Sequence, residues 1–178
     1  LTETEVNYVE AALNKIIAGK YYEENRMMLT GKFHSGEVKA LNEIVVTRKG
    51  HLRIIHFNLY VNGMLLYSYR ADGIIISTPT GSTAYSLSVG GPIMMPENHN
   101  LIIAPVASHS LNVRPLIIPD DWRIDLKVSS RSHSFLASID GRSITMPDTA
   151  SISISKADYT VRIIRLEGHS FLNTLKTK

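Results

Sequence analysis

The residues best suited to chemistry lie in the segment Ser77–Ser88, which reads STPTGSTAYSLS. Its hydroxyl side chains crowd around Pro79 and Gly81 and belong to Ser77, Thr78, Thr80, Ser82 and Thr83. Small side chains let a ligand approach the backbone closely, and a glycine adds conformations that other residues avoid. Exposed backbone N–H groups in such a turn form an anion-binding concavity. The segment therefore predicts a loop that binds phosphate or ribose.

Two elements must position this loop. The β-branched run Gly73–Ile76 before it is typical of a strand buried on both faces, which gives the loop a rigid base. A helix is expected to begin near Ser82 or Thr83, and its unpaired N–H groups would face the same spot. Tyr85 adds an aromatic face for a ligand.

A simpler interpretation of the segment is a strand, an ordinary turn and a Ser/Thr helix cap. One capping residue is enough to start a helix, so the density of hydroxyl groups favours a ligand loop. The segment carries neither the lysine of a P-loop nor a GxGxxG pattern. Neither of those two phosphate-binding motifs therefore applies.

The rest of the chain predicts a mainly β fold. Apolar residues at helical spacing between Val6 and Ile17, after the possible caps Thr2 and Thr4, indicate an amphipathic helix of about four turns that ends near Gly19. Turn signals at Asn62-Gly63 and Asp140-Gly141 indicate hairpins. Strands are expected at 39–47, 52–61, 64–69, 73–76, 101–105, 116–118, 122–128, 135–139, 143–146, 151–155 and 161–166.

This pattern of many short strands favours antiparallel, sandwich-like packing over alternating βα units. A short helical end is expected around Phe171, Leu172 and Leu175. The expected architecture is thus one β-rich domain over residues 1–178, with an amphipathic helix before it and a short helix after it.

Composition limits the possible functions. The 178 residues are 44% hydrophobic and 20% charged, as in ordinary globular domains. The absence of cysteine excludes disulfides, thiolate metal sites and cysteine catalysis. No apolar stretch reaches membrane length and no basic run with aromatics points to nucleic acid, so a cytoplasmic protein without membrane or nucleic-acid partners is expected. No histidine pair has metal-binding spacing, so no protein-held metal is expected.

The sequence also resembles a known family. TPTGSTAYSLSVGGP, after a buried strand with Asp72 at its start, closely resembles the nucleotide-binding signature of NAD kinases. Leu41–Val45 (LNEIV) looks like the Asn-Glu motif of that family, and 105–119 and 169–178 also follow its pattern. The resemblance covers nearly the whole chain and implies the β-rich C-terminal domain of such a kinase.

The resemblance implies a set of nucleotide-binding residues. They are Asn42, Glu43, Arg53, Arg70, Asp72, Thr80, Thr83, Ala84, Tyr85, Ser86, Ser88 and Ala107. From the residues alone, Asn42 and Glu43 could simply form a solvated strand edge. Asp72 and Arg70, two residues apart on one face, could simply form a salt bridge. His109 is expected to be a core or turn histidine, and Arg142 stands where many family members have glutamine.

The resemblance further implies transfer of a phosphoryl group from ATP or polyphosphate to the 2′-hydroxyl of the adenosine ribose of NAD, giving NADP. Mg²⁺ or another divalent ion would come with ATP, and a homodimer or homotetramer is expected. The Gly-Gly-Asp-Gly motif, whose aspartate serves that family as general base, does not occur in these residues. No catalytic residue is therefore expected in this chain, and little turnover without a further domain. The alternatives are a lipid or sphingoid kinase domain and a non-catalytic NAD(P) sensor.

Overall fold

The structure is a computed structural model that describes residues 6–34, 36–50, 54–110, 112–168 and 170–176. It divides into two compact units. One unit comprises the two ends of the chain, Leu1–Arg26 and Val161–Lys178, and the other comprises Met27–Thr160. Each unit is described by itself.

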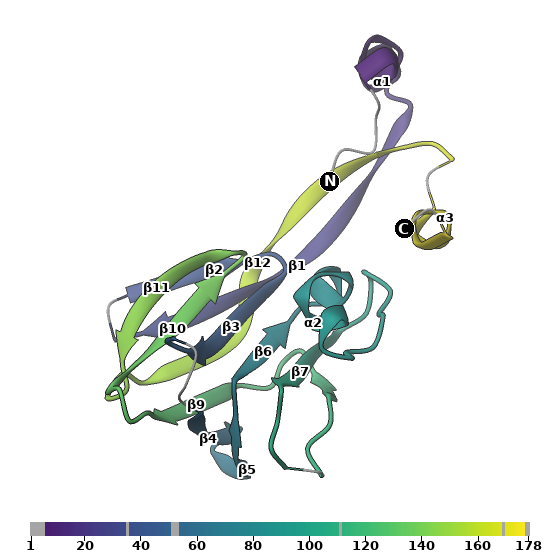
Figure 1. The fold of residues 1–178 in the computed structure, drawn as a ribbon. Helices are drawn as coiled ribbons and strands as arrows, with labels where there is room; N and C mark the ends of the chain where they lie inside the picture. The colour runs from purple at the N-terminus through teal and green to yellow at the C-terminus, as the bar shows by residue number, and fades with distance from the viewer. Residues whose placement is uncertain (1–5, 35, 51–53, 111, 169, 177–178) are drawn as a thin grey trace. The chain divides into compact units, whose positions relative to one another are not determined.

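The larger unit contains most of two six-stranded sheets, while the first residues of β1 and the last residues of β12 belong to the smaller unit. In spatial order the first sheet contains β2 (Gly36–Ala40), β1 (Tyr21–Phe33), β12 (Ile152–Leu166), β9 (Ile124–Ser129), β4 (Ile55–Val61) and β5 (Met64–Ala71). The second sheet contains β11 (Arg142–Pro147), β10 (Ser134–Ile139), β3 (Glu43–Arg48), β6 (Gly73–Ser77), β7 (Asn100–Val106) and β8 (Leu116–Pro119). Neighbouring strands such as β3 and β6 run antiparallel (Figure 1).

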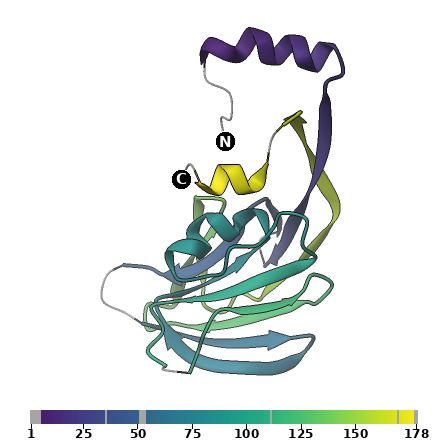
Figure 2. The ribbon, with the colours of Figure 1, turned by 90° about the vertical axis from the view of Figure 1, so that its right-hand side faces the viewer.

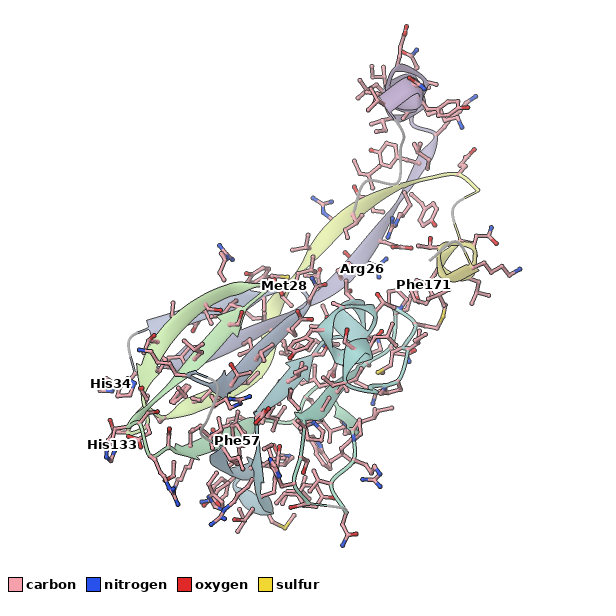
Figure 3. The ribbon with its side chains drawn as sticks, viewed as in Figure 1. Arg26, Met28, His34, Phe57, His133 and Phe171 are labelled. Carbon is pink, nitrogen blue, oxygen red and sulfur yellow. The ribbon has the colours of Figure 1, made fainter. Side chains whose placement is uncertain are left out.

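Both sheets bury side chains in one apolar cluster. Phe57 of β4, labelled in Figure 3, and Phe135 of β10 belong to different sheets and are both fully buried in this cluster. Strand β4 alternates buried and half-buried residues, as expected for a strand with one face on a core. Two antiparallel sheets packed around a shared core form a sandwich. The predicted mainly β, sandwich-like fold is confirmed.

Strand β6 differs from β4 because both of its faces are covered. All five of its residues are buried. Ile74 and Ile76 belong to the core between the sheets, whereas Ile75 packs with Val45 and Met94 in a second cluster. This explains the unbroken apolar run in the sequence, and it gives the loop after Ser77 a fixed starting point.

Several predicted boundaries were wrong. The segment predicted as one strand at 39–47 is β2 and β3, separated by a bend at Leu41-Asn42. The strands predicted at 151–155 and 161–166 are one strand, β12. Strand β1 was not predicted, because its first half, YYEENR, lacks an apolar alternation. The hairpin turns at Asn62-Gly63 and Asp140-Gly141 are confirmed, with positive φ at all four residues.

The smaller unit contains both helical ends of the chain. A 3₁₀ turn, η1 (Val6–Tyr8), leads into α1 (Val9–Ile17), seen from its side in Figure 2. Helix α1 is shorter than the four turns predicted, it has no buried residue, and the cap candidates Thr2 and Thr4 lie outside the described residues. The short final helix is confirmed as α3 (Phe171–Lys176). Ion pairs join this unit's strand segments, at Arg162–Glu23 and Arg165–Glu24.

Candidate functional site

The hydroxyl-rich loop lies beyond the end of β6, where the chain passes through a 3₁₀ turn, η2 (Thr80–Thr83), into α2 (Tyr85–Ser88) (Figure 1). The helix begins at Tyr85, later than the predicted Ser82 or Thr83. It is only four residues long, so it has little dipole to offer an anion. The dipole of α2 therefore adds little to anion binding by this loop.

The loop is held against the bend between β2 and β3. The backbone N–H of Thr78 donates to the carbonyl oxygen of Asn42 at 2.9 Å, and the Thr78 hydroxyl donates to the carbonyl oxygen of Leu41 at 2.6 Å. The same hydroxyl oxygen accepts from the N–H of Gly81 at 3.1 Å. Ser77 and Thr78, two of the small residues expected to let a ligand approach the backbone, are fully buried, and their hydrogen bonds fix the loop.

Gly81 is required for a different reason than its freedom at positive φ. A Cβ at this position would lie 2.2 Å from the carbonyl oxygen of Asn42 and 2.6 Å from the Ser77 hydroxyl oxygen. The loop can therefore approach the Asn42 backbone only because residue 81 has no side chain. The structure thus brings the backbone of Asn42 and the loop together.

Glu43, the first residue of β3, directly follows the bend that holds the loop. Its side chain is buried, with 7% of the residue exposed. Burial and the neighbouring Asp140 carboxylate raise the pKa of Glu43 to about 7, although a hydrogen bond from the backbone N–H of Tyr85 acts in the opposite direction.

Buried polar atoms without partners occur in the loop and next to the bend that holds it. Among the described residues, buried side-chain atoms without a hydrogen-bond partner are found at Arg26 in the smaller unit and at three residues here. The three are the Oε2 of Glu43, the Oγ1 of Thr80 and the Oγ of Ser86. Buried polar atoms normally form hydrogen bonds, so each of these three atoms is available to bond to a ligand. A carboxylate and hydroxyls suit the hydroxyl groups of a ribose better than the negative charge of a phosphate.

The remaining predicted residues of the loop lie close by in the chain. Thr83 and Ala84 are half-buried, while Tyr85 and Ser88 are exposed, with 41% of Tyr85 open to solvent. Ser86 is fully buried, and its hydroxyl oxygen would lie 2.3 Å from a Cβ at Gly91. Tyr85 is therefore free to cover a ligand, whereas Ser86 lies beneath the surface.

Asp140 is a member of this group whose role sequence reasoning missed. Its carboxylate accepts the backbone N–H groups of Leu41 at 2.7 Å, Asn42 at 2.8 Å and Glu43 at 3.0 Å. The sequence explained Asp140 fully as a hairpin turn residue, so nothing marked it as a contact of the Asn42–Glu43 bend. The residues involved are 97 to 99 positions apart, which no local pattern reveals.

The other predicted residues form a second group at the opposite end of β6. Asp72 directly precedes this strand, and its N–H donates to the carbonyl oxygen of Val106, next to Ala107. Arg70 is exposed, and its carbonyl oxygen accepts the N–H of His109, an exposed histidine in the loop after β7. Because four residue steps of a strand span about 13 Å, one copy of this chain does not bring the two groups together.

The simpler interpretation, a salt bridge between Asp72 and Arg70, is wrong, because Asp72 pairs with Arg48. Its carboxylate accepts two hydrogen bonds from the guanidinium of Arg48, with Nε at 2.9 Å and an Nη at 3.1 Å. Arg48 lies at the end of β3, and its backbone N–H also bonds to the carbonyl oxygen of Asp72. Arg53 lies outside the described residues, so its predicted contribution has no structural counterpart here.

Within the described ranges, no cluster of three or more His, Cys, Asp or Glu side chains is arranged to hold a metal ion. Across the same residues, no helix has both the length and the apolar character needed to cross a membrane.

Two antiparallel sheets around one core, with a polar loop beyond a fully buried strand, define a mainly β domain with a candidate site for a hydroxyl-bearing ligand. The family model described as the ATP-NAD kinase C-terminal domain matches residues 41–166. The chain belongs to this family.

Similar proteins agree with this assignment. The chain is 43% identical over 182 residues to an NAD kinase of Bacteroides fragilis, and the aligned region covers 100% of this chain and 63% of that protein. It is 41% identical over 180 residues to an NAD kinase of Porphyromonas gingivalis, covering 100% of this chain and 62% of that protein. The chain thus spans less than two thirds of the length of these relatives.

Solved structures share the fold. Yeast NADH kinase complexed with NADH superposes with a TM-score of 0.89 at 22% identity, covering 99% of this chain and 55% of that one. An NAD kinase from Archaeoglobus fulgidus in complex with ATP gives a TM-score of 0.79 at 26% identity, covering 94% of this chain and 64% of that one.

Proposed function

We propose that this chain is the dinucleotide-holding part of an NAD kinase, which converts NAD to NADP. The observation that carries the proposal is that Glu43, next to the bend that holds the loop, and Thr80, in the loop itself, each have a buried side-chain oxygen without a hydrogen-bond partner. Ribose hydroxyls are donors that can satisfy both. Asn42 supplies an amide and Tyr85 an exposed ring for the base. Family membership and the names of the relatives support the same reading.

The reaction needs positioning and charge neutralisation more than covalent chemistry by the protein. The 2′-hydroxyl oxygen of the adenosine ribose forms a bond to the terminal phosphorus of ATP, or of polyphosphate, as the bond to the leaving phosphate oxygen breaks. The proton of the hydroxyl passes to a base. In the family this is the aspartate of a Gly-Gly-Asp-Gly motif, which does not occur in these residues. Here the chain's own residues bind and orient the ribose, and the isolated chain has no useful turnover.

A divalent ion such as Mg²⁺ is expected to arrive with the phosphates of ATP. Mg²⁺ usually keeps several waters and needs only one or two protein carboxylates. The described residues contain no cluster that could cage the ion, so the donor set fits an ion held mainly by the nucleotide.

The two groups of predicted residues fit a site completed by a second copy of the chain. Arg70 and Asp72 lie at the end of β6 away from Thr80 and Tyr85, and exposed Arg70 is suited to a phosphate. We therefore assign Arg70, Asp72 and Ala107 to the site of a neighbouring copy in a homodimer or homotetramer.

Calorimetric titration of the chain with NAD and NADP tests the proposal. Asn42→Ala and Tyr85→Ala are expected to weaken binding at least about tenfold each, because a lost hydrogen bond or a lost base stack costs about that much. Tyr159→Ala is the matched control, since Tyr159 of β12 is 44% exposed, close to the 41% of Tyr85.

Three results would contradict the proposal in different ways. A folded wild-type chain that binds neither dinucleotide would contradict dinucleotide holding by this chain. Equal losses in Tyr85→Ala and Tyr159→Ala would place binding elsewhere. Robust NAD phosphorylation by the chain alone would overturn the assignment of the base to another part of the kinase. Binding without phosphorylation by the full-length protein would favour the NAD(P) sensor.

A further inference from the structure

We propose that Asp140 is a positioning residue that holds Asn42, Glu43 and the Thr78–Gly81 loop in the geometry needed to bind the dinucleotide. The proposal rests on the proposed function for its ligand, but its structural part stands on contacts of the chain alone. The Asp140 side chain contacts two of the predicted ligand-binding residues, Asn42 and Glu43, at their backbone N–H groups. It acts, in this proposal, through the bend between β2 and β3.

The Asp140 carboxylate accepts three hydrogen bonds from the backbone of the bend. One oxygen, Oδ2, accepts the N–H of Leu41, and the other, Oδ1, accepts the N–H groups of Asn42 and Glu43. Three consecutive N–H groups thus converge on one carboxylate. Hydrogen bonds to a charged acceptor are about twice as strong as neutral ones. The orientation of this bend therefore depends on the position of Asp140.

The same bend is also hydrogen-bonded to the loop. The carbonyl oxygens of the same residues, Leu41 and Asn42, accept hydrogen bonds from Thr78. The Thr78 hydroxyl in turn accepts the N–H of Gly81, whose α-carbon lies against the Asn42 carbonyl. Asp140 and the loop are therefore both hydrogen-bonded to the backbone of Leu41 and Asn42. A movement of this bend would shift the loop as well.

These contacts of Asp140 go beyond what a residue in a hairpin turn requires. Asp140 and Gly141 have φ values of 44° and 83°, as in a type I′ hairpin. The turn at Asn62 and Gly63 has nearly the same φ values, 48° and 81°, but among the described residues the Asn62 side chain accepts one N–H, that of Arg123 at 2.9 Å. A turn alone therefore does not require three contacts to a segment about 98 residues away.

The matched test compares Asp140→Gly with Asn62→Gly. Glycine keeps the positive φ of either turn and removes only the side chain. Asp140→Asn is the conservative variant, because it also tolerates positive φ, retains one acceptor oxygen and places an amide N–H₂ where the other oxygen was. All three are compared with the wild-type chain.

The first readout is amide hydrogen exchange without ligand. In Asp140→Gly, the amides of Thr78 and Gly81 are expected to exchange at least about tenfold faster relative to those of Ile74 and Ile76, which report the core. Asp140→Asn should fall between this variant and the wild type, and Asn62→Gly should leave the ratio unchanged. A general loss of stability would raise all these exchange rates together and so would not alter the ratio.

The second readout is the Kd for NAD, measured on the folded protein. Asp140→Gly is expected to raise it at least about tenfold, with partial rescue in Asp140→Asn. An unchanged exchange ratio, or an unchanged Kd in Asp140→Gly when the wild type binds, would overturn the proposal. If the wild type binds no NAD, the proposed function fails, and the exchange ratio alone decides whether Asp140 holds the loop. If Asp140→Gly does not fold, Asp140→Asn decides by the same two criteria.

Discussion

Burial and a neighbouring carboxylate make the free energy of unfolding depend on the protonation of Glu43. Its carboxyl is buried beside the carboxylate of Asp140, which raises its pKa from 4.5 to about 7. Between these two values the folded protein holds a proton that the unfolded chain has released. The free energy of unfolding therefore falls as pH rises from about 4.5 to above 7, by up to about 3 kcal/mol from this group.

Glu43→Gln removes this titration. We expect the difference in unfolding free energy between pH 5 and pH 8 to be smaller in the variant than in the wild type, because glutamine carries no charge at either pH. Urea unfolding at both pH values measures the difference. Glu97→Gln, at an exposed position, serves as control. An identical pH dependence in Glu43→Gln and the wild type would mean that Glu43 titrates normally.

Gly81→Ala tests the close approach of the loop to the bend. The new Cβ would lie 2.2 Å from the Asn42 carbonyl oxygen, so backbone must move. We expect a loss of about 2–4 kcal/mol in unfolding free energy, above the usual cost of a point substitution. Gly90→Ala is the control, because Gly90 has φ +83° but nothing within 4 Å of an added Cβ. That variant should lose only about 1 kcal/mol. Equal losses in both variants would show that sterics at the bend do not limit the loop.

At the scale of elements, Arg48 and Asp72 join the end of β3 to the start of β6. Their two hydrogen bonds are parallel and the side chains are 24% and 30% exposed. A double-mutant cycle with Arg48→Met and Asp72→Asn is expected to give a coupling of about 0.5–1 kcal/mol, since the pair is partly screened by solvent. The pair Arg123–Asp125, with a 61% exposed arginine, should couple more weakly. Equal couplings would show that the bidentate geometry adds nothing.

The sequence was most informative where structure is determined locally. The turns at Asn62-Gly63 and Asp140-Gly141 follow from the few residues that accept positive φ, and β6 follows from its apolar run. It was least informative where distant segments meet. The contacts of Asp140 with the bend and of Arg48 with Asp72 depend on strand order, which no local pattern encodes. Strand β1 was missed for a related reason, because sheet pairing and not propensity makes it a strand.

At the scale of the whole molecule, apolar burial is uneven. The core cluster lies within Met27–Thr160, whereas α1 has no buried residue, and Val6, Leu13 and Ile17 are all more than half exposed. We expect the amides of α1 to exchange with solvent orders of magnitude faster than those of β3 and β6, because a helix of nine residues without packing is marginal in water. Hydrogen exchange followed by mass spectrometry measures both regions at once. Equal protection would show that α1 is packed in solution.

The hydrogen bonds between Asp140 and Leu41–Glu43 are expected to form late in folding. The partners are 97 to 99 residues apart, so the contact closes one of the longest loops in the chain. Contacts of this kind form late, because their loop-closure entropy must be overcome before they stabilise anything. During synthesis, the Ser77–Ser88 segment leaves the ribosome well before residue 140 does. A nascent chain therefore exposes the hydroxyl-rich loop early, but completes its anchoring only after the β10–β11 hairpin has emerged.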